Sequence, residues 1–358
     1  MKNEKIIHVY ADWMSTEPQF MGRLYVSEIR GKEIFSFEYD GSWLNKDQGI
    51  FFGPDLHLYA GRQYAPMDKN QFGIFSDSSP DRWGRTLMNR REAIRAKKEE
   101  RKPKKLTESD YLLGVYDATR MGALRFSLEE HGDFLSNDTE LAAPPWTTLR
   151  TLEEACLSFE KGGVESDEEK WLKQLVAPGS SLGGARPKAS IEAPDGSLWI
   201  AKFPSRHDEE NVEAWEMVVH ELAAECGLNV PEAKLESFHD RRGTFLVKRF
   251  DRNGNRRIHF SSAMNLLGQT DGSKEAGYLD IVSFIRSYGA SPREDTTMDF
   301  NLALDTAKYY DISKERARSI VKEIKAIVSE KWEMIAKQCG LDRSAIVRME
   351  PAFSMEYK

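Results

Sequence analysis

A glycine-rich stretch followed by two basic residues offers the clearest chemistry in this sequence. It covers residues 177–188 and reads Ala-Pro-Gly-Ser-Ser-Leu-Gly-Gly-Ala-Arg-Pro-Lys. Glycine lets a backbone approach a ligand closely, and the free N–H groups of such a loop form a concavity that suits phosphate oxygens. Arg186 and Lys188 add positive charge. The stretch predicts a phosphate-binding loop, although a flexible connector has the same composition.

A lysine within an apolar strand follows the loop. After a turn over residues 194–196, the sequence Ser-Leu-Trp-Ile-Ala-Lys-Phe-Pro places Lys202 between Ala201 and Phe203. A charged side chain in such surroundings needs an anionic partner. The alternative is an edge lysine that discourages pairing with other strands.

A helix with glutamates comes next, over residues 208–226. Its apolar residues recur at helical spacing, namely Val212, Trp215, Val219, Leu222, Ala223 and Cys226, and Gly227 ends it. We expect Glu216, rather than Glu221, to meet Lys202, although a solvated acid is the alternative for both. The order of loop, hairpin, lysine and helix is typical of a protein kinase small lobe, in which the loop covers the phosphates and the lysine pairs with a glutamate.

The remaining pattern predicts an α+β fold. Residues 5–65 hold β-branched and aromatic runs separated by turn residues, which indicates a small sheet or barrel. A helix begins near Pro80 or Asp81, a closing strand ends at Phe126, and the polar segment 129–145 is the best linker. Two further strands precede a helical end of the chain, and these elements are expected at 233–238, 244–250, 277–288, 298–310 and from Ser313 onward.

The composition limits the classes of function. The 358 residues are 30% charged and carry a net charge of -7, which argues against a surface built throughout for nucleic acid. No apolar run has the length of a membrane span and the start is not signal-like, so we expect a cytosolic protein without membrane contact. The cysteines at 156, 226 and 339 lie in apolar helical patterns and are interpreted as core thiols.

A basic segment lies at residues 95–105. Its basic residues are Arg95, Lys97, Lys98, Arg101, Lys102, Lys104 and Lys105. Such a cluster could contact a nucleic-acid backbone. A solvated helix end that runs into a loop is the favoured alternative, because Glu99 and Glu100 dilute the charge and Pro103 breaks the helix.

Six motifs together resemble the HipA family of serine/threonine kinases, the toxin half of a bacterial toxin–antitoxin pair. They read Phe75-Ser-Asp-Ser-Ser-Pro-Asp-Arg-Trp-Gly-Arg85, Met121-Gly-Ala-Leu-Arg-Phe126, Ser181-Leu-Gly-Gly-Ala-Arg-Pro-Lys188, Ala201-Lys-Phe-Pro204, Gly227-Leu-Asn-Val-Pro-Glu232 and Val247-Lys-Arg-Phe-Asp-Arg252. The resemblance covers most of the chain.

The resemblance implies a three-part architecture and a set of site residues. The parts are a β-rich N-terminal subdomain at 1–145, a mixed kinase small lobe at 146–252 and an all-helical large lobe at 253–358. ATP and Mg²⁺ are the implied cofactors, with Ser181 as the autophosphorylated serine, Lys202 on the phosphates and residues 247–250 as the adenine hinge. The implied ATP-binding residues are Ser181, Gly183, Gly184, Ala185, Arg186, Lys188, Lys202, Glu216, Val247, Lys248 and Phe250.

Partners follow from the same resemblance. Family targets include aminoacyl-tRNA synthetases, whose phosphorylation stops translation. The usual partner is a DNA-binding, HipB-like antitoxin, which neutralises the toxin and connects it to DNA indirectly.

The sequence departs from the family at the catalytic loop. The family supplies the acids for phosphoryl transfer from a loop of the form Asn-x-Asp-x-His-x-x-Asn and from a later metal-binding Asp. No histidine follows His259, and the large lobe resembles an internally deleted one near residue 295; Asp299-Phe-Asn301 is better read as helix than as a kinase metal motif. Three explanations stay open: a deletion form of an active kinase, a degenerate homologue that keeps nucleotide binding, or acids supplied by another segment.

Two functions therefore remain. The first is a HipA-like Ser/Thr kinase toxin that phosphorylates a translation protein, with its catalytic and metal-binding residues unassigned. The second is a catalytically silent pseudokinase, or an inactive deletion form, that binds a nucleotide or a partner. A purely structural protein is placed last, because it would leave Lys202 and the paired glycines without a reason.

Overall fold

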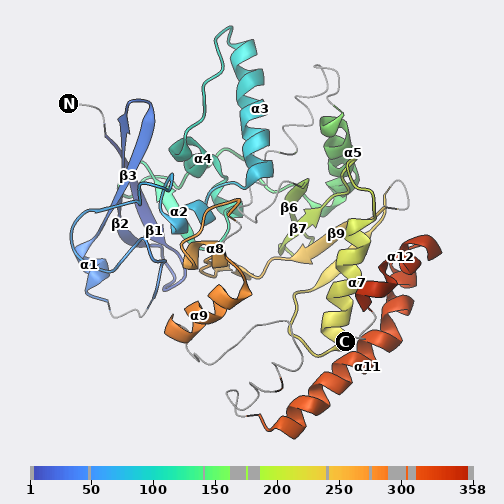
Figure 1. Cartoon of the computed structure of the whole chain (residues 1–358). Helices are drawn as coiled ribbons and strands as arrows, with labels where there is room; N and C mark the ends of the chain where they lie inside the picture. Colours follow the sequence, from blue (N-terminus) through green and yellow to red (C-terminus); the bar gives the residue numbers. More distant parts are fainter. Residues whose placement is uncertain are drawn as a thin grey trace. The chain divides into compact units, whose positions relative to one another are not determined.

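The computed structural model describes residues 4–46, 50–139, 142–161, 175, 186–238, 242–273, 276–288, 304 and 312–353. The chain forms two compact units (Figure 1), one from Met1–Ser205 with Lys248–Asp271 and one from Arg206–Val247 with Gly272–Lys358. The expected α+β class, with a β-rich N-terminal region and a helical C-terminal part, is confirmed. The three-domain division by residue range stays a prediction.

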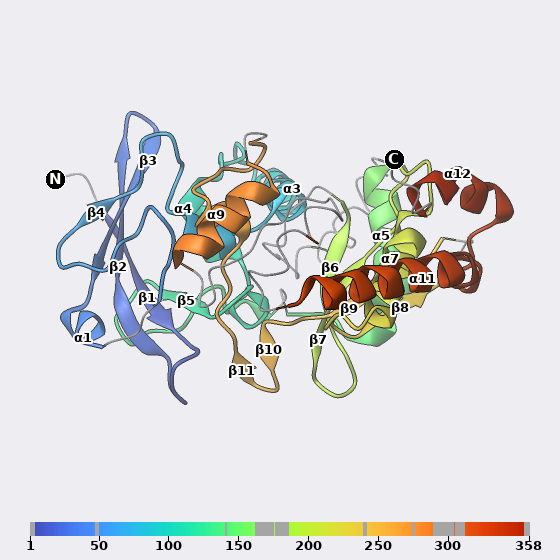
Figure 2. The same cartoon turned by 60° about the horizontal axis from the view of Figure 1, so that its bottom comes forward.

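The first unit is built on a five-stranded antiparallel sheet in the order β4-β3-β2-β1-β5 (Figure 2). Its strands are β1 (Lys5–Ala11), β2 (Gln19–Ile29), β3 (Lys32–Tyr39), β4 (Gln63–Tyr64) and β5 (Leu124–Ser127). Arg30 and Gly31 between β2 and β3 both have positive φ, at 52° and 77°, as a tight two-residue hairpin turn requires. Because β5 pairs with β1, the later strand closes the sheet as the sequence predicted.

One face of this sheet carries the core of the first unit. Strand residues such as Phe35 and Phe37 share an apolar cluster with Trp43 of α1 (Gly41–Leu44), Phe75 of α2 (Gly73–Asp77) and Leu112 of α4 (Glu108–Gly114). The alternation of buried and half-buried residues along β2 is the period of two that a one-sided sheet demands. The three long strands lie within residues 5–65, the region that the sequence predicted to be β-rich.

Helix α3 (Arg82–Lys98) begins at the expected Ser/Asp/Pro cluster. Its N-cap is Asp81, whose carboxylate accepts a hydrogen bond from the N–H of Gly84 at 2.7 Å. A capping box at Thr107 and Asp110 starts α4. These caps fix the two helices that follow the first sheet strands in the chain.

The later part of the first unit holds short elements. They are η1 (Asp117–Thr119), η3 (Trp146–Thr148), α5 (Leu149–Glu160), β6 (Lys188–Glu192), β7 (Leu198–Lys202), β10 (Arg252–Asn253), β11 (Arg256–Arg257) and α8 (Ala263–Leu266). Strands β6 and β7 form the expected antiparallel hairpin, and Gly196 in its turn has a φ of 79°. The β10–β11 hairpin was not predicted.

The second unit is mainly helical. Its elements are α7 (Val212–Glu225), β8 (Ala233–Glu236), β9 (Thr244–Lys248), α9 (Tyr278–Tyr288), α11 (Lys314–Gln338) and α12 (Arg343–Phe353). Helix α11 packs against α7 and α12, and the core they share contains Trp215, Leu222, Trp332 and Ile346. The Phe353 ring stacks on Trp332 with 4.7 Å between centroids.

The apolar row predicted for α7 is wrong at Val219, and the apolar row of α11 is buried only toward the end of that helix. On α7, Val219 is exposed and Val218 is buried, because the buried row runs from Trp215 by steps of three and four residues. On α11, Val328, Trp332 and Ile335 are buried, whereas the apolar residues nearer its start are only half-buried. The expected helix at 298–310 lies outside the described residues, apart from Leu304.

The sequence predicted that the three cysteines are core thiols and that the protein has no membrane contact. All three cysteines are free; Cys156 is fully buried in α5, where burial raises its pKa, and Cys226 and Cys339 are half-buried. Across the described residues, the helices lack the combined length and apolar character needed to cross a bilayer.

Candidate functional site

The glycine-rich loop is described only at its downstream end. Outside the described residues lie Ser181, Gly183, Gly184 and Ala185. Their contacts with phosphate, and the autophosphorylation of Ser181, therefore stay predictions. Arg186 precedes the hairpin, and Lys188 is the first residue of β6.

Lys188, at the start of β6, is held by contacts with Asp81 and Trp83. Its ammonium lies 2.5 Å from a carboxylate oxygen of Asp81, and the two side chains are 5% and 3% exposed. The indole N–H of Trp83 donates a hydrogen bond to the Lys188 carbonyl oxygen at 3.1 Å. A buried lysine keeps its charge only beside such a partner. Side chain and backbone of Lys188 are thus both held by the N-terminal end of α3.

Asp81 serves the helix and the hairpin at once. One carboxylate oxygen caps α3 through Gly84, and the other holds Lys188. Burial raises the pKa of Asp81, and the neighbouring Lys188 charge opposes that rise. The motif at residues 75–85 therefore reaches the residue that ends the glycine-rich motif. Sequence reasoning proposed Asp81 only as a cap, since its partner lies 107 positions away.

Lys202 lies directly opposite Lys188 in the hairpin register. Opposed residues of an antiparallel pair project from the same face, so the two lysines share one face of β6 and β7. Lys202 is half-buried, flanked by the buried residues Ala201 and Phe203. Like charges at opposed positions destabilise a sheet unless anions lie nearby, and Asp81 supplies one such anion.

The other predicted ATP-binding residues lie on two elements. Glu216 is on α7 in the second unit, so its pairing with Lys202 stays a prediction. The expected adenine hinge begins at the unit boundary, between Val247 and Lys248 at the end of β9. Phe250 is half exposed, and its ring lies 5.6 Å from that of Phe260.

A buried ion pair joins Arg249 of the expected hinge to Asp251, which directly follows the hinge. The guanidinium of Arg249 donates to both carboxylate oxygens of Asp251 at 2.8 and 2.6 Å, and both side chains are fully buried. Arg249 also donates to the Thr119 carbonyl oxygen at 2.7 Å, and Asp251 accepts from the Gly122 N–H at 2.8 Å. Burial acts to raise the pKa of Asp251, but the hydrogen bond and charge of Arg249 bring it below its usual value. These contacts join the motif at residues 121–126 to the motif at residues 247–252.

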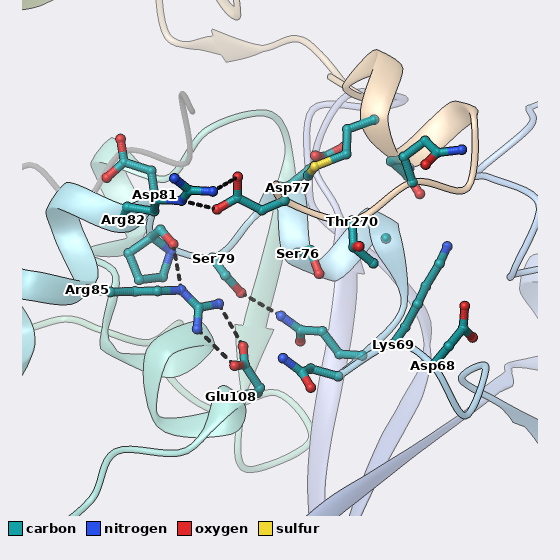
Figure 3. Close-up of a pocket in the computed structure, with 18 residues that line it drawn as sticks. Asp68, Lys69, Ser76, Asp77, Ser79, Asp81, Arg82, Arg85, Glu108 and Thr270 are labelled. Carbon is teal, nitrogen blue, oxygen red and sulfur yellow. Dashed lines mark hydrogen bonds and ion pairs between the residues drawn. The ribbon is translucent and has the colours of Figure 1, made fainter. Parts of the chain in front are cut away.

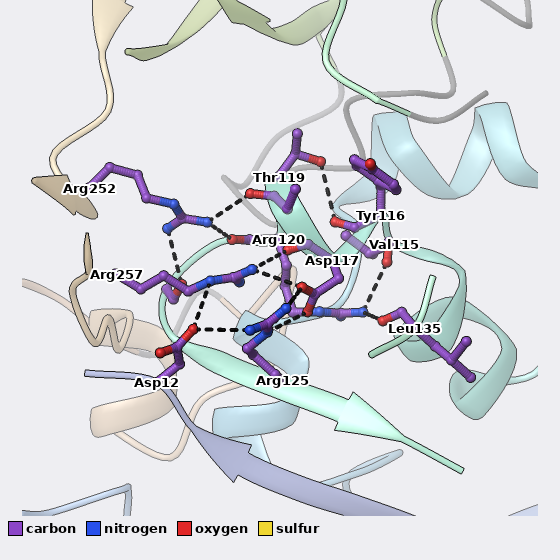
Figure 4. Close-up of polar contacts among 12 residues, drawn as sticks. Asp12, Val115, Tyr116, Asp117, Thr119, Arg120, Arg125, Leu135, Arg252 and Arg257 are labelled. Atoms are coloured by element: carbon purple, nitrogen blue, oxygen red, sulfur yellow. Dashed lines mark hydrogen bonds and ion pairs between the residues drawn. The ribbon is translucent and has the colours of Figure 1, made fainter. Parts of the chain in front are cut away.

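A second buried arginine organises the neighbouring backbone (Figure 4). Arg120 donates to four carbonyl oxygens, those of Ser78, Leu112, Val115 and Leu135, at 2.8 to 3.0 Å. Burial lowers its pKa to about 9, which leaves it charged at neutral pH. Because its donors reach segments on either side of α3, Arg120 fixes the framework from which α3 starts.

Asp117 balances this positive charge. It pairs with Arg125 at 2.5 Å and with Arg257 at 2.9 Å, and Asp12 contacts the same two arginines (Figure 4). Burial acts to raise the pKa of Asp117, but the charge of Arg257 and the hydrogen bond from Arg125 lower it below its usual value. These are structural contacts, which the sequence alone does not distinguish from surface charges.

A polar pocket of about 490 Å³ adjoins the start of α3 (Figure 3). The motif at 75–85 lines one side of it, and residues 264–271 contribute another. Arg82 pairs with Asp271 at 2.6 Å, and Arg85 pairs with Glu108 through two hydrogen bonds of 2.7 and 2.8 Å. Arg82 and Arg85, which line this pocket, are thus both paired with carboxylates of the protein itself.

Among the acids that line this pocket, Asp77 has the most strongly shifted pKa. It accepts hydrogen bonds from the N–H and the hydroxyl of Ser262 at 2.7 and 2.6 Å. Burial nevertheless raises its pKa to about 6. Its geometry ties α2 to the start of α8. Among the described residues, no group of three or more His, Cys, Asp or Glu side chains could hold a metal ion.

Comparison with known proteins gives one family and one fold. A family model described as the HipA-like C-terminal domain matches residues 180–304. No curated protein matches the sequence. A chain of the solved complex of HipA, HipB and its operator DNA, from the Shewanella oneidensis MR-1 toxin–antitoxin system, is similar in fold with a TM-score of 0.54. The match covers 97% of this chain and 95% of that chain at 13% sequence identity.

Proposed function

We propose that the chain is a HipA-like Ser/Thr kinase toxin, as its six motifs indicate, and that it binds ATP phosphates on the β6–β7 hairpin. The matched family domain begins at residue 180, within the glycine-rich loop, and includes the whole hairpin. The proposed substrate is a protein of translation, such as an aminoacyl-tRNA synthetase. Its identity rests on the family resemblance alone.

The single observation that carries the proposal is the opposed pair Lys188 and Lys202. Asp81 holds Lys188 at the end of the loop. The family resemblance assigns Lys202, on the same face, to the phosphates. Arg186 and the loop backbone would complete the anion site. Such an arrangement binds phosphate by charge and by N–H donors, as in phosphoryl-transfer enzymes.

Mg²⁺ would enter this site as part of Mg²⁺-ATP, held by the phosphate oxygens. The described residues offer no acidic cluster that fits a protein-bound metal. What the chain supplies is the placement of the phosphates at the hairpin.

A second candidate is a catalytically silent nucleotide-binding module. The observation that favours it is the sequence after His259, which has no histidine and so lacks the family's catalytic loop. Without a positioned acid the hydroxyl of an acceptor would not be oriented, and charge in the transition state would not be stabilised.

Calorimetry with Mg²⁺-ATP, combined with incorporation of labelled phosphate in the same sample, separates these candidates. Binding with incorporation into Ser181 or an added protein supports the kinase toxin. Binding without incorporation supports the silent module. A lack of binding at millimolar ATP would contradict both.

A HipB-like antitoxin is the proposed protein partner. The support is that the similar chain of known structure comes from a complex of HipA, HipB and operator DNA. In that proposal, contact with the operator would be made by the antitoxin. Co-expression with a HipB protein and light scattering of the purified complex tests it, and two separate species would contradict it.

A further inference from the structure

The basic segment at the end of α3 forms one exposed surface. Eight side chains of residues 90–105 are exposed and positively charged, namely Arg90, Arg95, Lys97, Lys98, Arg101, Lys102, Lys104 and Lys105, and these are called the basic surface. The segment has nine basic and three acidic residues, while the whole chain has a net charge of -7. Positive charge is thus concentrated on one element of an acidic protein.

Two of the three acids are engaged by the segment itself. Glu92 accepts hydrogen bonds from Arg101 at 2.5 and 3.2 Å and from the Lys104 N–H at 2.7 Å. Glu99 accepts from Arg95 at 2.7 Å and from Arg101 at 2.6 Å. These bonds lower the pKa of both carboxyl groups, so they stay charged and paired. The acids therefore hold the surface together, and the segment keeps an excess of six positive charges, from nine basic and three acidic residues.

The chain turns after α3 and runs back beside it (Figure 1). Glu100 has a φ of 51° at the turn, and Glu92 binds the returning backbone at Lys104. Lys104 also pairs with Asp110 of α4 at 2.8 Å. The chain after Pro103 is therefore held in place by contacts with Glu92 and Asp110. The helix end and the returning strand of chain present their cations as one fixed surface.

We propose that the basic surface binds the phosphate backbone of double-stranded DNA without reading base sequence. Duplex DNA carries about one negative charge per 1.7 Å of its axis, and nine helical residues from Arg90 to Lys98 extend about 13 Å. The cations are thus spread over a length that meets several phosphates. Residues 90–105 contain no aromatic side chain for stacking on unpaired bases and no Asn or Gln for adenine, which favours a duplex backbone.

Titration of the full chain with a fluorescent 20-base-pair random-sequence duplex, at several salt concentrations, tests the inference. We expect Lys102→Gln with Lys105→Gln to weaken binding at least about tenfold near 0.1 M salt and to reduce the salt slope by about 2. Neither lysine lies in the nucleotide hairpin or contributes to the Glu92 and Glu99 bonds.

A matched control removes the same charge elsewhere. Lys32 on β3 and Lys322 on α11 are exposed, and changing both to Gln should leave DNA affinity within about twofold, since no phosphate contact is lost. Equal weakening in control and test variants would overturn the inference, as would absent salt-dependent binding. Equal affinity for poly-glutamate or for a single strand would also contradict it. ATP binding is measured separately, so failure here leaves the proposed function standing.

Discussion

The interiors of the two units differ in how many charged side chains they bury. In the first unit, Arg120, Arg249 and Asp251 are fully buried and bond to the backbone of motif segments. In the second, the described core is made mainly of apolar and aromatic side chains such as Trp332, and the ion pair of Lys331 with Glu225 lies at the surface. The first unit thus combines an apolar core with buried ion pairs, whereas the described core of the second unit is mainly apolar.

The difference has a physical meaning. A buried ion pair contributes little net stability compared with apolar packing, but it is very intolerant of losing one partner. It also fixes donors and acceptors in one arrangement. The first unit contains the β6–β7 hairpin, whose lysines need fixed positions, whereas α7, α11 and α12 only need to stay packed. We therefore expect buried ion pairs in the unit whose side chains must keep fixed positions.

Removal of Asp251 should have the largest effect on stability. Asp251→Ala leaves Arg249 buried without its carboxylate, which costs about 3–5 kcal/mol of unfolding free energy. Hydrogen–deuterium exchange resolved by peptide should show faster exchange around residues 117–126. As a control, Asp195→Ala at an exposed turn should cost less than about 1 kcal/mol. A loss below about 1 kcal/mol for Asp251→Ala would remove the distinction between the units.

The apolar core of the second unit gives the matching experiment. Trp332→Ala removes the ring that stacks on Phe353 and should cost about 3 kcal/mol, with faster exchange confined to α7, α11 and α12. Glu225→Gln breaks the exposed pair with Lys331 and should cost less than about 1 kcal/mol. If the surface change cost as much as the core change, the second unit would depend on charge after all.

A pH experiment sharpens the comparison at Asp77. Its pKa is raised from 3.8 to about 6 by burial, so between these values the folded protein holds a proton that the unfolded chain has lost. The free energy of unfolding therefore falls as the pH rises from 4 to 6. Asp77→Asn is neutral throughout, and the advantage of the wild type over it should shrink by on the order of 2 kcal/mol. Parallel stability curves in urea would contradict the assignment.

Much of the fold could be predicted from local pattern. Period-two alternation located β1, β2 and β3, and the cap at Asp81 located the start of α3. The turn predicted at residues 194–196 joins β6 and β7 in the structure. These elements depend on residues close together in the sequence, where local preferences decide the structure.

The polar contacts were not predictable in the same way. Nothing in the sequence distinguishes the buried Arg120 from the exposed Arg95, because burial of an arginine depends on carbonyl groups that distant segments supply. The Asp81–Lys188 pair joins residues 107 positions apart. Periodicity also allowed Val219 as readily as Val218 on α7, and tertiary packing selected Val218. Of the candidate site, the sequence identified its lysines but not the acid that anchors one of them.

The most direct test of the central claim is the affinity of Mg²⁺-ATP for the full chain and for Lys202→Met, measured by calorimetry. Lys202 lies across from the anchored Lys188 on the same face of the hairpin, so its loss should weaken binding at least about tenfold, or about 1.4 kcal/mol. Lys32→Met at an exposed position should bind like the wild type. Unchanged affinity in Lys202→Met would contradict the phosphate site on this hairpin.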